Sequence, residues 1–429
     1  MVNSNERLRS LFSAIADSIR SKTGETGTIN ATKFPEAIDA IKTGGSGATA
    51  SAGWNDVTFI DYDGTVLHSY SFEEVRKFTK LPELPSHERL VCQGWNWTLS
   101  NIKAMTSPVT VGANYITDDG ATRLHIRISN TSFKSVSLFI IQSTSTLVKW
   151  GDGSTSTISG SGNVTIQHSY NNIGDYVISI IPGSSSVIAL GHQSSSYCVV
   201  GSINNVEYLN MLQSVFIGER TAVIDYSFYN CYSLKNITFP SSYTQANIYK
   251  YAFANCYSLK SYTIPTNTTT VMENAFRDCR SLASIAFPYN CRTIQSNVFY
   301  NCYSLDNVSL PPYITSIYPS TFYSCGSLKT VTFPHDCNSI APNAFQNCYS
   351  LQKVIFRSPT GAKIYEQSFA DCYTMRCYDF SASTQVPYLS SVNGLCLRHG
   401  CQILVPSSLY SSWKSATNWS TYASYMVAV

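Results

Sequence analysis

The sequence predicts a multidomain protein of mainly β structure that ends in a solenoid of stacked repeats. Seven phenylalanines recur at intervals of 23 to 25 residues, and a cysteine follows each of them three positions later. They are Phe228, Phe253, Phe276, Phe299, Phe322, Phe345 and Phe369. Because the apolar residues keep the same offsets in every unit, no unit buries them alone, and neighbouring units must stack on one another.

Each repeat predicts a helical turn followed by a short strand. In the unit of Phe276, apolar residues at three-residue spacing precede Ile285-Ala-Phe287 and a proline. A proline ends each of these strands, because it lacks the backbone N–H that would continue the hydrogen bonds between strands. These prolines are Pro265, Pro288, Pro311 and Pro334. A β-branched residue five positions before the phenylalanine predicts a second short strand in the repeat. These residues are Val271, Ile294, Ile317, Ile340 and Ile364.

This pattern resembles the leucine-rich repeats of the BspA-like type, over roughly Val206 to Leu389. We expect a solenoid over residues 201–395 and a C-terminal cap over residues 396–429. The cap carries Trp413, Trp419 and Tyr422, which we expect to seal the end of the core.

Composition excludes some functions. A net charge of +3 with 13% charged residues leaves no basic surface for nucleic acid. The seven repeat cysteines lie in register, which favours small buried hydrophobes over disulfides. Cys396 and Cys401 flank a turn at Gly400, and the sequence leaves their pairing open. Without a Cys-x-x-Cys pair or clustered histidines, we predict no metal site and no cofactor.

The first 45 residues predict a helical hairpin. One apolar stripe consists of Leu8, Leu11, Phe12, Ile15 and Ile19, and it either packs on its own chain or serves attachment and oligomerisation. Ile15-Ala-Asp-Ser-Ile19, Lys22-Thr-Gly and Phe34-Pro-Glu-Ala-Ile38 look like the N-terminal segment of tail proteins from phages of gut Firmicutes. That resemblance implies phage tail or baseplate partners, and self-association as a trimer is open.

Residues 53–108 predict a small β-rich module. Phe59-Ile-Asp-Tyr-Asp-Gly-Thr-Val66 looks like the nucleophile motif of haloacid-dehalogenase-type phosphatases, which implies attack by Asp61 with Mg²⁺. That family needs a doubly wound core, whereas aromatic strands and a Pro-rich turn follow here. We therefore interpret Asp61 as part of a turn between two strands, and predict no enzyme.

Residues 109–200 predict alternating strands. The order Trp150-Gly-Asp-Gly-Ser154, His168-Ser-Tyr170 and Gly174-Asp-Tyr176 resembles polycystic-kidney-disease-type (PKD-type) domains, which are immunoglobulin-like β-sandwiches. We expect Trp150 and Tyr170 between the sheets, and Asp152 bonded to its own turn.

These parts together predict an adhesion device. We expect the outward strand positions to bind a bacterial surface glycan or protein receptor, at Asn236, Thr238, Ser261, Thr263, Ser284, Asn307, Ser309, Thr330, Thr332 and Lys353. A second row of Tyr232, Tyr257, Tyr303 and Tyr349 either stacks on sugars or shields the turns.

The leading hypothesis is a receptor-binding or fibre-like protein of a phage tail, made in the host cytoplasm and released by lysis. Met1 to Arg20 has no apolar export region, and no stretch of eighteen apolar residues occurs, so we expect neither Sec export nor membrane insertion. The alternative is a BspA-like adhesin on the surface of a bacterium or protist.

Overall fold

The computed structural model describes residues 56–429 except 63–64, 89, 107, 118, 131–133, 192–198, 202–209, 241–242, 244 and 360–361. The chain divides into two units, Met1–Trp54 and Asn55–Val429. The predicted helical hairpin, with Leu8, Leu11, Phe12, Ile15 and Ile19, lies outside the described residues. Among those that are described, no helix is long and apolar enough to cross a membrane.

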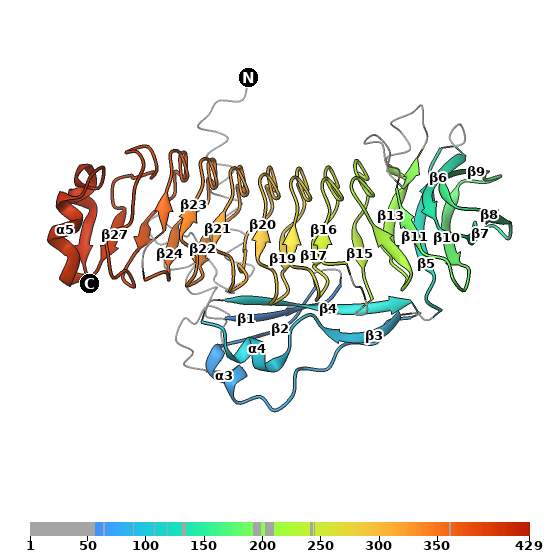
Figure 1. Ribbon diagram of the computed structural model, residues 1–429, viewed down its shortest axis with the longest axis horizontal. Coiled ribbons are helices and arrows are strands. Elements are labelled where there is room, and N and C mark those ends of the chain that lie inside the picture. Colours follow the sequence, from blue (N-terminus) through green and yellow to red (C-terminus); the bar gives the residue numbers. More distant parts are fainter. Residues whose placement is uncertain are drawn as a thin grey trace, which may run out of the picture. The chain divides into compact units, whose positions relative to one another are not determined.

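A four-stranded sheet begins the second unit, in the order β2-β1-β4-β3 (Figure 1). Its elements are β1 Val57–Ile60, β2 Val66–Tyr70, α3 Phe72–Arg76, β3 Leu90–Trp95, α4 Leu99–Lys103 and β4 Val109–Thr117. A capping box of Ser71 and Glu74 starts α3. Val57, Phe59, Val75 and Ile102 form the centre of its own small core.

The boundary that the sequence predicted between residues 108 and 109 is wrong. Strand β4 pairs in parallel with β1 and antiparallel with β3, so it belongs to this first module. The physical reason is that Val109 and Val111 are buried in the core of the module. Residues 57–117, called the N-terminal module below, therefore form one sheet with two short helices on it.

Two larger sheets follow, with strand orders β15-β13-β5-β10-β7-β8 and β12-β6-β11-β14, and β9 pairs with β6. Their strands before the repeats are β5 Thr122–Ile128, β6 Ser135–Gln142, β7 Ser145–Lys149, β8 Thr155–Ser159, β9 Gly162–Ser169, β10 Gly174–Pro182, β11 Ile188–Leu190 and β12 Val200–Gly201. Trp150 and Tyr170 are buried as predicted, and the Tyr170 hydroxyl donates to the Trp150 carbonyl oxygen at 2.8 Å.

Both sheets continue into the solenoid. Strand β5 pairs antiparallel with β13 Leu212–Phe216, which pairs in parallel with β15 Asn236–Thr238. On the other side, β11 pairs in parallel with β14 Thr221–Val223. One hydrophobic cluster runs from Leu124 to Met426. The strands of residues 122–201 therefore close the first end of the solenoid and share its core.

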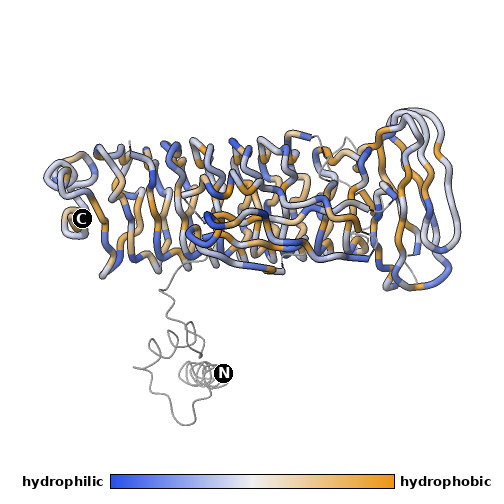
Figure 2. The backbone as a smooth tube through the Cα atoms, turned by 90° about the horizontal axis from the view of Figure 1, so that it is seen from below, coloured by the Kyte–Doolittle hydropathy of each residue, from blue (hydrophilic) through white to orange (hydrophobic). Residues whose placement is uncertain are grey.

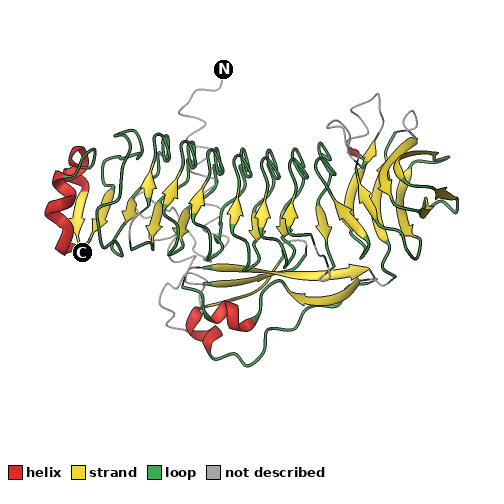
Figure 3. Ribbon diagram, viewed as in Figure 1, coloured by secondary structure: helices red, strands yellow, loops and turns green. Residues whose placement is uncertain are grey.

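The solenoid carries two parallel rows of short strands, as predicted (Figure 3). The first row continues with β17 Ser261–Thr263, β19 Ser284–Ala286, β22 Thr330–Phe333, β24 Lys353–Phe356, β26 Cys377–Asp379, β27 Gln402–Val405 and β28 Met426–Ala428. The second row holds β16 Asn247–Ile248, β18 Thr270–Val271, β20 Thr293–Ile294, β21 Ser316–Ile317, β23 Ser339–Ile340 and β25 Lys363–Ile364. Hydrophobic and hydrophilic residues alternate along these turns (Figure 2).

The segment around each repeat phenylalanine is not the helical turn that we predicted. Two residues in each turn have positive φ, as Asn297 (57°) and Asn301 (60°) do beside Phe299. Such residues interrupt a right-handed helix, and asparagine tolerates this region better than most side chains. The backbone bonds to the next repeat instead: the Phe276 N–H donates to the Val298 carbonyl oxygen at 3.0 Å.

The phenylalanines and cysteines form two buried columns. Successive rings stack with centroids 5.0 to 5.7 Å apart. From Cys256 to Cys372, each thiol donates to the carbonyl oxygen of the phenylalanine one repeat earlier, at 3.1 to 3.3 Å. Burial raises the pKa of each of these six thiols. A cysteine at this offset therefore satisfies a buried acceptor.

Two findings concern the disulfides. Cys231 is disulfide-bonded, so its interpretation as a simple buried hydrophobe is wrong, whereas the other six cysteines of the column are free. The pairing that the sequence left open does not occur, because Cys396 and Cys401 are both free.

The C-terminal cap closes the last turn. It contains η3 Ser407–Leu409, α5 Tyr410–Ser415 and η4 Ser420–Tyr425 between β27 and β28. Trp413 and Trp419 are buried against the Phe380 ring, with centroids 5.0 and 5.5 Å from it. These tryptophans cover the open end of the core, as predicted.

Candidate binding surfaces

The first row of strands is the surface that the sequence singled out, but the N-terminal module covers part of it. Strand β4 contacts β15, β17 and β19, and the views in Figures 1 and 2 show its sheet lying across the solenoid turns. The Trp97 indole N–H donates to the Phe287 carbonyl oxygen, and the Asn96 carboxamide donates to the Ala286 carbonyl oxygen at 3.4 Å. Trp97 also packs edge-on against Tyr289, with ring centroids 5.3 Å apart.

Gly112 makes this close approach of the two backbones feasible. A Cβ atom at this position would lie 2.3 Å from Thr263 Oγ1 and 2.4 Å from Thr263 Cγ2. Nearby, the Thr110 and Ser309 hydroxyls lie 3.5 Å apart across the same interface. The absence of a side chain therefore lets β4 lie directly on the solenoid strands.

Four of the ten predicted ligand-binding positions are thus not exposed. Thr238, Ser261, Thr263 and Ser309 are between 3% and 9% exposed. The prediction was wrong for them because the polar outward positions of these turns face another part of the same chain. Asn236 and Ser284 are partly buried.

The open part of the face begins after the N-terminal module. Asn307 is exposed, and Thr330, Thr332 and Lys353 are half-buried, so these predicted positions remain accessible. The Lys353 ammonium lies 3.7 Å from the Asp379 carboxylate on the adjacent strand. Among these four accessible positions, Lys353 is the charged one.

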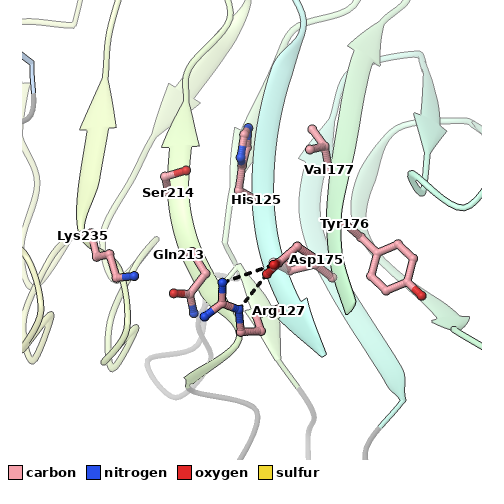
Figure 4. A pocket seen from close by; sticks show the side chains of 9 residues that line it. His125, Arg127, Asp175, Tyr176, Val177, Gln213, Ser214 and Lys235 are labelled. Atoms are coloured by element: carbon pink, nitrogen blue, oxygen red, sulfur yellow. Dashed lines mark hydrogen bonds and ion pairs between the residues drawn. The ribbon is translucent and has the colours of Figure 1, made fainter. Parts of the chain in front are cut away.

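A shallow pocket of about 230 Å³ lies over β5, β10 and β13 (Figure 4). Arg127 makes a bidentate ion pair with Asp175 at 2.7 and 3.2 Å, which lowers the pKa of that carboxyl. Gln213 and Lys235 line the solenoid side of the pocket. The pocket could not be predicted from the sequence, since its residues come from four separated segments with no common motif.

The row of predicted tyrosines forms a stacked edge along the turns. Tyr232 and Tyr257 stack at 4.6 Å with an interplanar angle of 6°, and the Arg280 guanidinium lies 4.6 Å above the Tyr257 ring. Farther on, Tyr349 stacks on Tyr373 at 5.9 Å. Arg398 covers Tyr373 at 5.0 Å.

We name this set the tyrosine–arginine row, and its members are Tyr232, Tyr257, Arg280, Tyr303, Tyr349, Tyr373 and Arg398. Tyr303, Tyr349 and Tyr373 are 43%, 47% and 50% exposed. Three members, Arg280, Tyr373 and Arg398, were not predicted, although Arg280 and Tyr373 follow the repeat cysteines at the same offset as the predicted tyrosines.

Asp61, the aspartate of the phosphatase-like motif, has structural partners. Asp61 is 5% exposed, and its carboxylate lies 2.8 Å from His87 Nε2 and accepts the Tyr62 N–H. Burial and this carboxylate raise the pKa of Tyr115 beside it. Within the described part of the chain, no three His, Cys, Asp or Glu side chains gather into a candidate metal site.

Asp152 bonds its own turn, as predicted. Its carboxylate accepts the Ser154 N–H at 3.0 Å and lies 2.7 Å from His168 Nε2. Although burial opposes ionisation, these contacts and the Ser154 hydroxyl lower the pKa of Asp152 to about 2. His168 stacks on Trp150 at 4.7 Å, so the cluster links the turn to the hydrophobic core that contains Trp150.

Comparison with known proteins finds a family that matches the repeats. Residues 203–247 and 246–376 match the BspA type leucine rich repeat region in six copies. No curated protein matches the chain. Among solved structures, a leucine-rich repeat protein of T. pallidum shares 24% identity over 40% of this chain and 75% of its own, with a TM-score of 0.32.

Two further structures match over 64% of their own length. A leucine-rich cell surface protein of Faecalibacterium prausnitzii shares 22% identity over 42% of this chain, with a TM-score of 0.29. The pneumococcal vaccine antigen PcpA shares 13% identity over 51%, with a TM-score of 0.33. With the family match and the stacked turns, residues 203–376 of this chain are a BspA-type leucine-rich repeat region.

Proposed function

We propose that this protein is an adhesin-type binding protein that recognises a molecule on a bacterial surface, and that it is not an enzyme. The observation that carries this proposal is the exposed tyrosine–arginine row on a rigid stack of turns. Aromatic side chains with few rotatable bonds contribute contact area at a low entropic cost, which suits recognition. The open strand positions Thr330, Thr332 and Lys353 add hydrogen-bonding groups.

At a finer level, we propose that the chain is a receptor-binding or fibre-like protein of a phage tail. The support is the resemblance of residues 15–38 to tail proteins from phages of gut Firmicutes. On this proposal the protein attaches to tail or baseplate proteins, is released from the host by lysis, and binds a host glycan or protein. The PKD-type resemblance of residues 109–200, through Trp150, Asp152 and Tyr170, fits a rigid link between the attachment segment and the solenoid, whose first end these strands close.

Adsorption competition tests the proposed function. The purified full-length chain is added to host cells before phage, and the free phage titre is measured. We expect saturating protein to block adsorption, and an equal concentration of a protein with the tyrosines of the row changed to alanine to block it less. Adsorption that is unaffected at saturation contradicts the proposal. Binding to cells without competition with any phage favours the alternative, a cell-surface adhesin.

A further inference from the structure

The tyrosine–arginine row has one vacant position, at Gly326. This glycine follows Cys325 at the offset where other turns carry Tyr232, Tyr257, Arg280, Tyr303, Tyr349 and Tyr373. The turns on both sides are its direct neighbours, because the Ser327 N–H donates to the Tyr303 carbonyl oxygen at 3.0 Å and the Ser350 N–H to the Gly326 carbonyl oxygen at 3.1 Å. Tyr303 and Tyr349 therefore lie two turns apart, and the residue between them in the row has no side chain.

The width of this vacancy fits one ring. Adjacent strands are spaced by about 4.8 Å, so two turns span about 9.6 Å. A ring in van der Waals contact with an aromatic face on each side needs about 7 to 8 Å, and the puckered chair of a pyranose needs slightly more. A Cβ atom at Gly326 would meet Tyr349 Cδ2 at 3.8 Å and the Tyr303 carbonyl oxygen at 3.9 Å, which are ordinary contacts. The position therefore accepts a Cβ atom without any shift of the backbone.

The residues beside the repeat cysteines of these three turns are polar, and none of them is charged. The polar residues beside the repeat cysteines of these three turns are Asn301, Tyr303, Ser304, Ser324, Ser327, Asn347, Tyr349 and Ser350. The corresponding positions of the flanking turns include the charged residues Asp278, Arg280 and Asp371. Hydroxyls and carboxamides both donate and accept hydrogen bonds, as the hydroxyls of a sugar require. None of the eight residues is itself a counter-ion for a charged ligand. The Asn301 carboxamide donates to the Asp278 carboxylate of the preceding turn at 2.9 Å, and the Asn347 carboxamide donates to the Tyr323 hydroxyl at 2.9 Å, so their carbonyl oxygens are left as acceptors.

We propose that the Gly326 vacancy binds one uncharged pyranose of a bacterial surface glycan between the rings of Tyr303 and Tyr349. The flat C–H faces of the sugar pack on the two aromatic faces, and its hydroxyls bond to the surrounding serine and asparagine side chains. This inference deepens the proposed function, because it names the ligand class and the place on the row where the ligand is held.

The test is titration of the full-length protein with neutral and charged monosaccharides. The probes are the methyl glycosides of glucose, galactose and N-acetylglucosamine, with methyl glucuronide and glucosamine as charged comparators, and binding is followed by calorimetry and saturation-transfer NMR. We expect at least one neutral glycoside to bind in the millimolar range and the charged ones to bind more weakly.

Gly326→Tyr completes the row and fills the vacancy. We expect it to weaken the binding of that glycoside at least about tenfold, since both stacking contacts are lost. We expect no decrease in the melting temperature of the protein. Gly326→Ala also replaces the glycine but adds only a methyl group, so it controls for the effect on the backbone. We expect it to retain more affinity for the glycoside than Gly326→Tyr does. Tyr388→Ala removes an exposed ring that does not belong to the row, and we expect no change in affinity.

Two results overturn the inference: no saturable binding by any neutral glycoside, or binding to Gly326→Tyr that equals binding to the unchanged protein. Adsorption competition reports on the proposed function separately. If the unchanged protein competes with phage but binds no glycoside, the adhesin proposal stands and the pyranose site fails. If it binds a glycoside but does not compete, the site stands and the phage role fails.

Discussion

The contact between β4 and the solenoid predicts that Gly112→Ala destabilises the protein. The new Cβ atom would lie 2.3 Å from Thr263 Oγ1 and 2.4 Å from Thr263 Cγ2. Ordinary contacts between carbon atoms lie at about 3.5 to 4.0 Å, so an opening of more than about 1 Å is needed. Rotation of the threonine does not remove the clash, because Thr263 Cβ itself would be 2.8 Å away.

Overpacking of this kind costs typically about 1 to 3 kcal/mol. We expect a decrease of that size in the free energy of unfolding, measured by urea titration. The matched control is Gly326→Ala, where the same change makes contacts of only 3.8 and 3.9 Å. Thr263→Ala in the Gly112→Ala background removes two of the three close atoms, so it should restore part of the loss.

Equal stability of Gly112→Ala and Gly326→Ala would refute the close approach of β4 to Thr263. A second readout is the exposure of the covered strands, followed by hydroxyl-radical footprinting of residues 261–263. We expect these residues to be protected in the unchanged protein and more reactive in Gly112→Ala. Early reactivity in the unchanged protein would show that the N-terminal module does not cover them.

Three further predictions concern single side chains. Phe299→Ala should cost about 3 to 5 kcal/mol in the free energy of unfolding, because its buried ring stacks between rings at 5.7 and 5.3 Å; a loss below about 1 kcal/mol would contradict the column. The pKa of Asp152 is lowered to about 2 in the folded protein, from 3.8. Its contribution to the free energy of unfolding is therefore full above pH 4 and is lost as the pH falls toward 2. In Asp152→Asn the urea midpoint should depend less on pH over that range, and an unchanged pH dependence would argue against the contacts of Asp152. Asp61, bonded to His87, should support no Mg²⁺-dependent hydrolysis of an aryl phosphate, and turnover that Asp61→Asn abolishes would show a phosphatase.

The repeats could be predicted from the sequence because every turn uses the same residues for the same purpose. The positions of Phe276 and Ile294 are enough to place a turn and the second short strand, and the structure confirms both rows. The left-handed turns had a signal as well, since asparagine recurs two residues after the phenylalanine, as in Asn301 and Asn347. We interpreted that segment as helical because apolar spacing alone does not report the sign of φ.

The burial of Thr263 and Ser309 could not be predicted from the period. A repeat pattern treats all turns alike, whereas β4 covers only some of them and lies more than 100 residues earlier in the chain. Gly112 shows how a single missing side chain decides this contact. The tyrosine–arginine row was partly predictable, because the offset of Tyr257 also selects Arg280.

Site-resolved thiol labelling during urea unfolding tests most directly whether the turns share one continuous interior. The column cysteines Cys256, Cys279, Cys302, Cys325, Cys348 and Cys372 are buried and free, whereas Cys92 is exposed. We expect Cys92 to react with a maleimide at once in native protein, and the six column thiols to become reactive together over one urea range. Separate midpoints for different column thiols, or rapid labelling of several in native protein, would contradict a single stacked core.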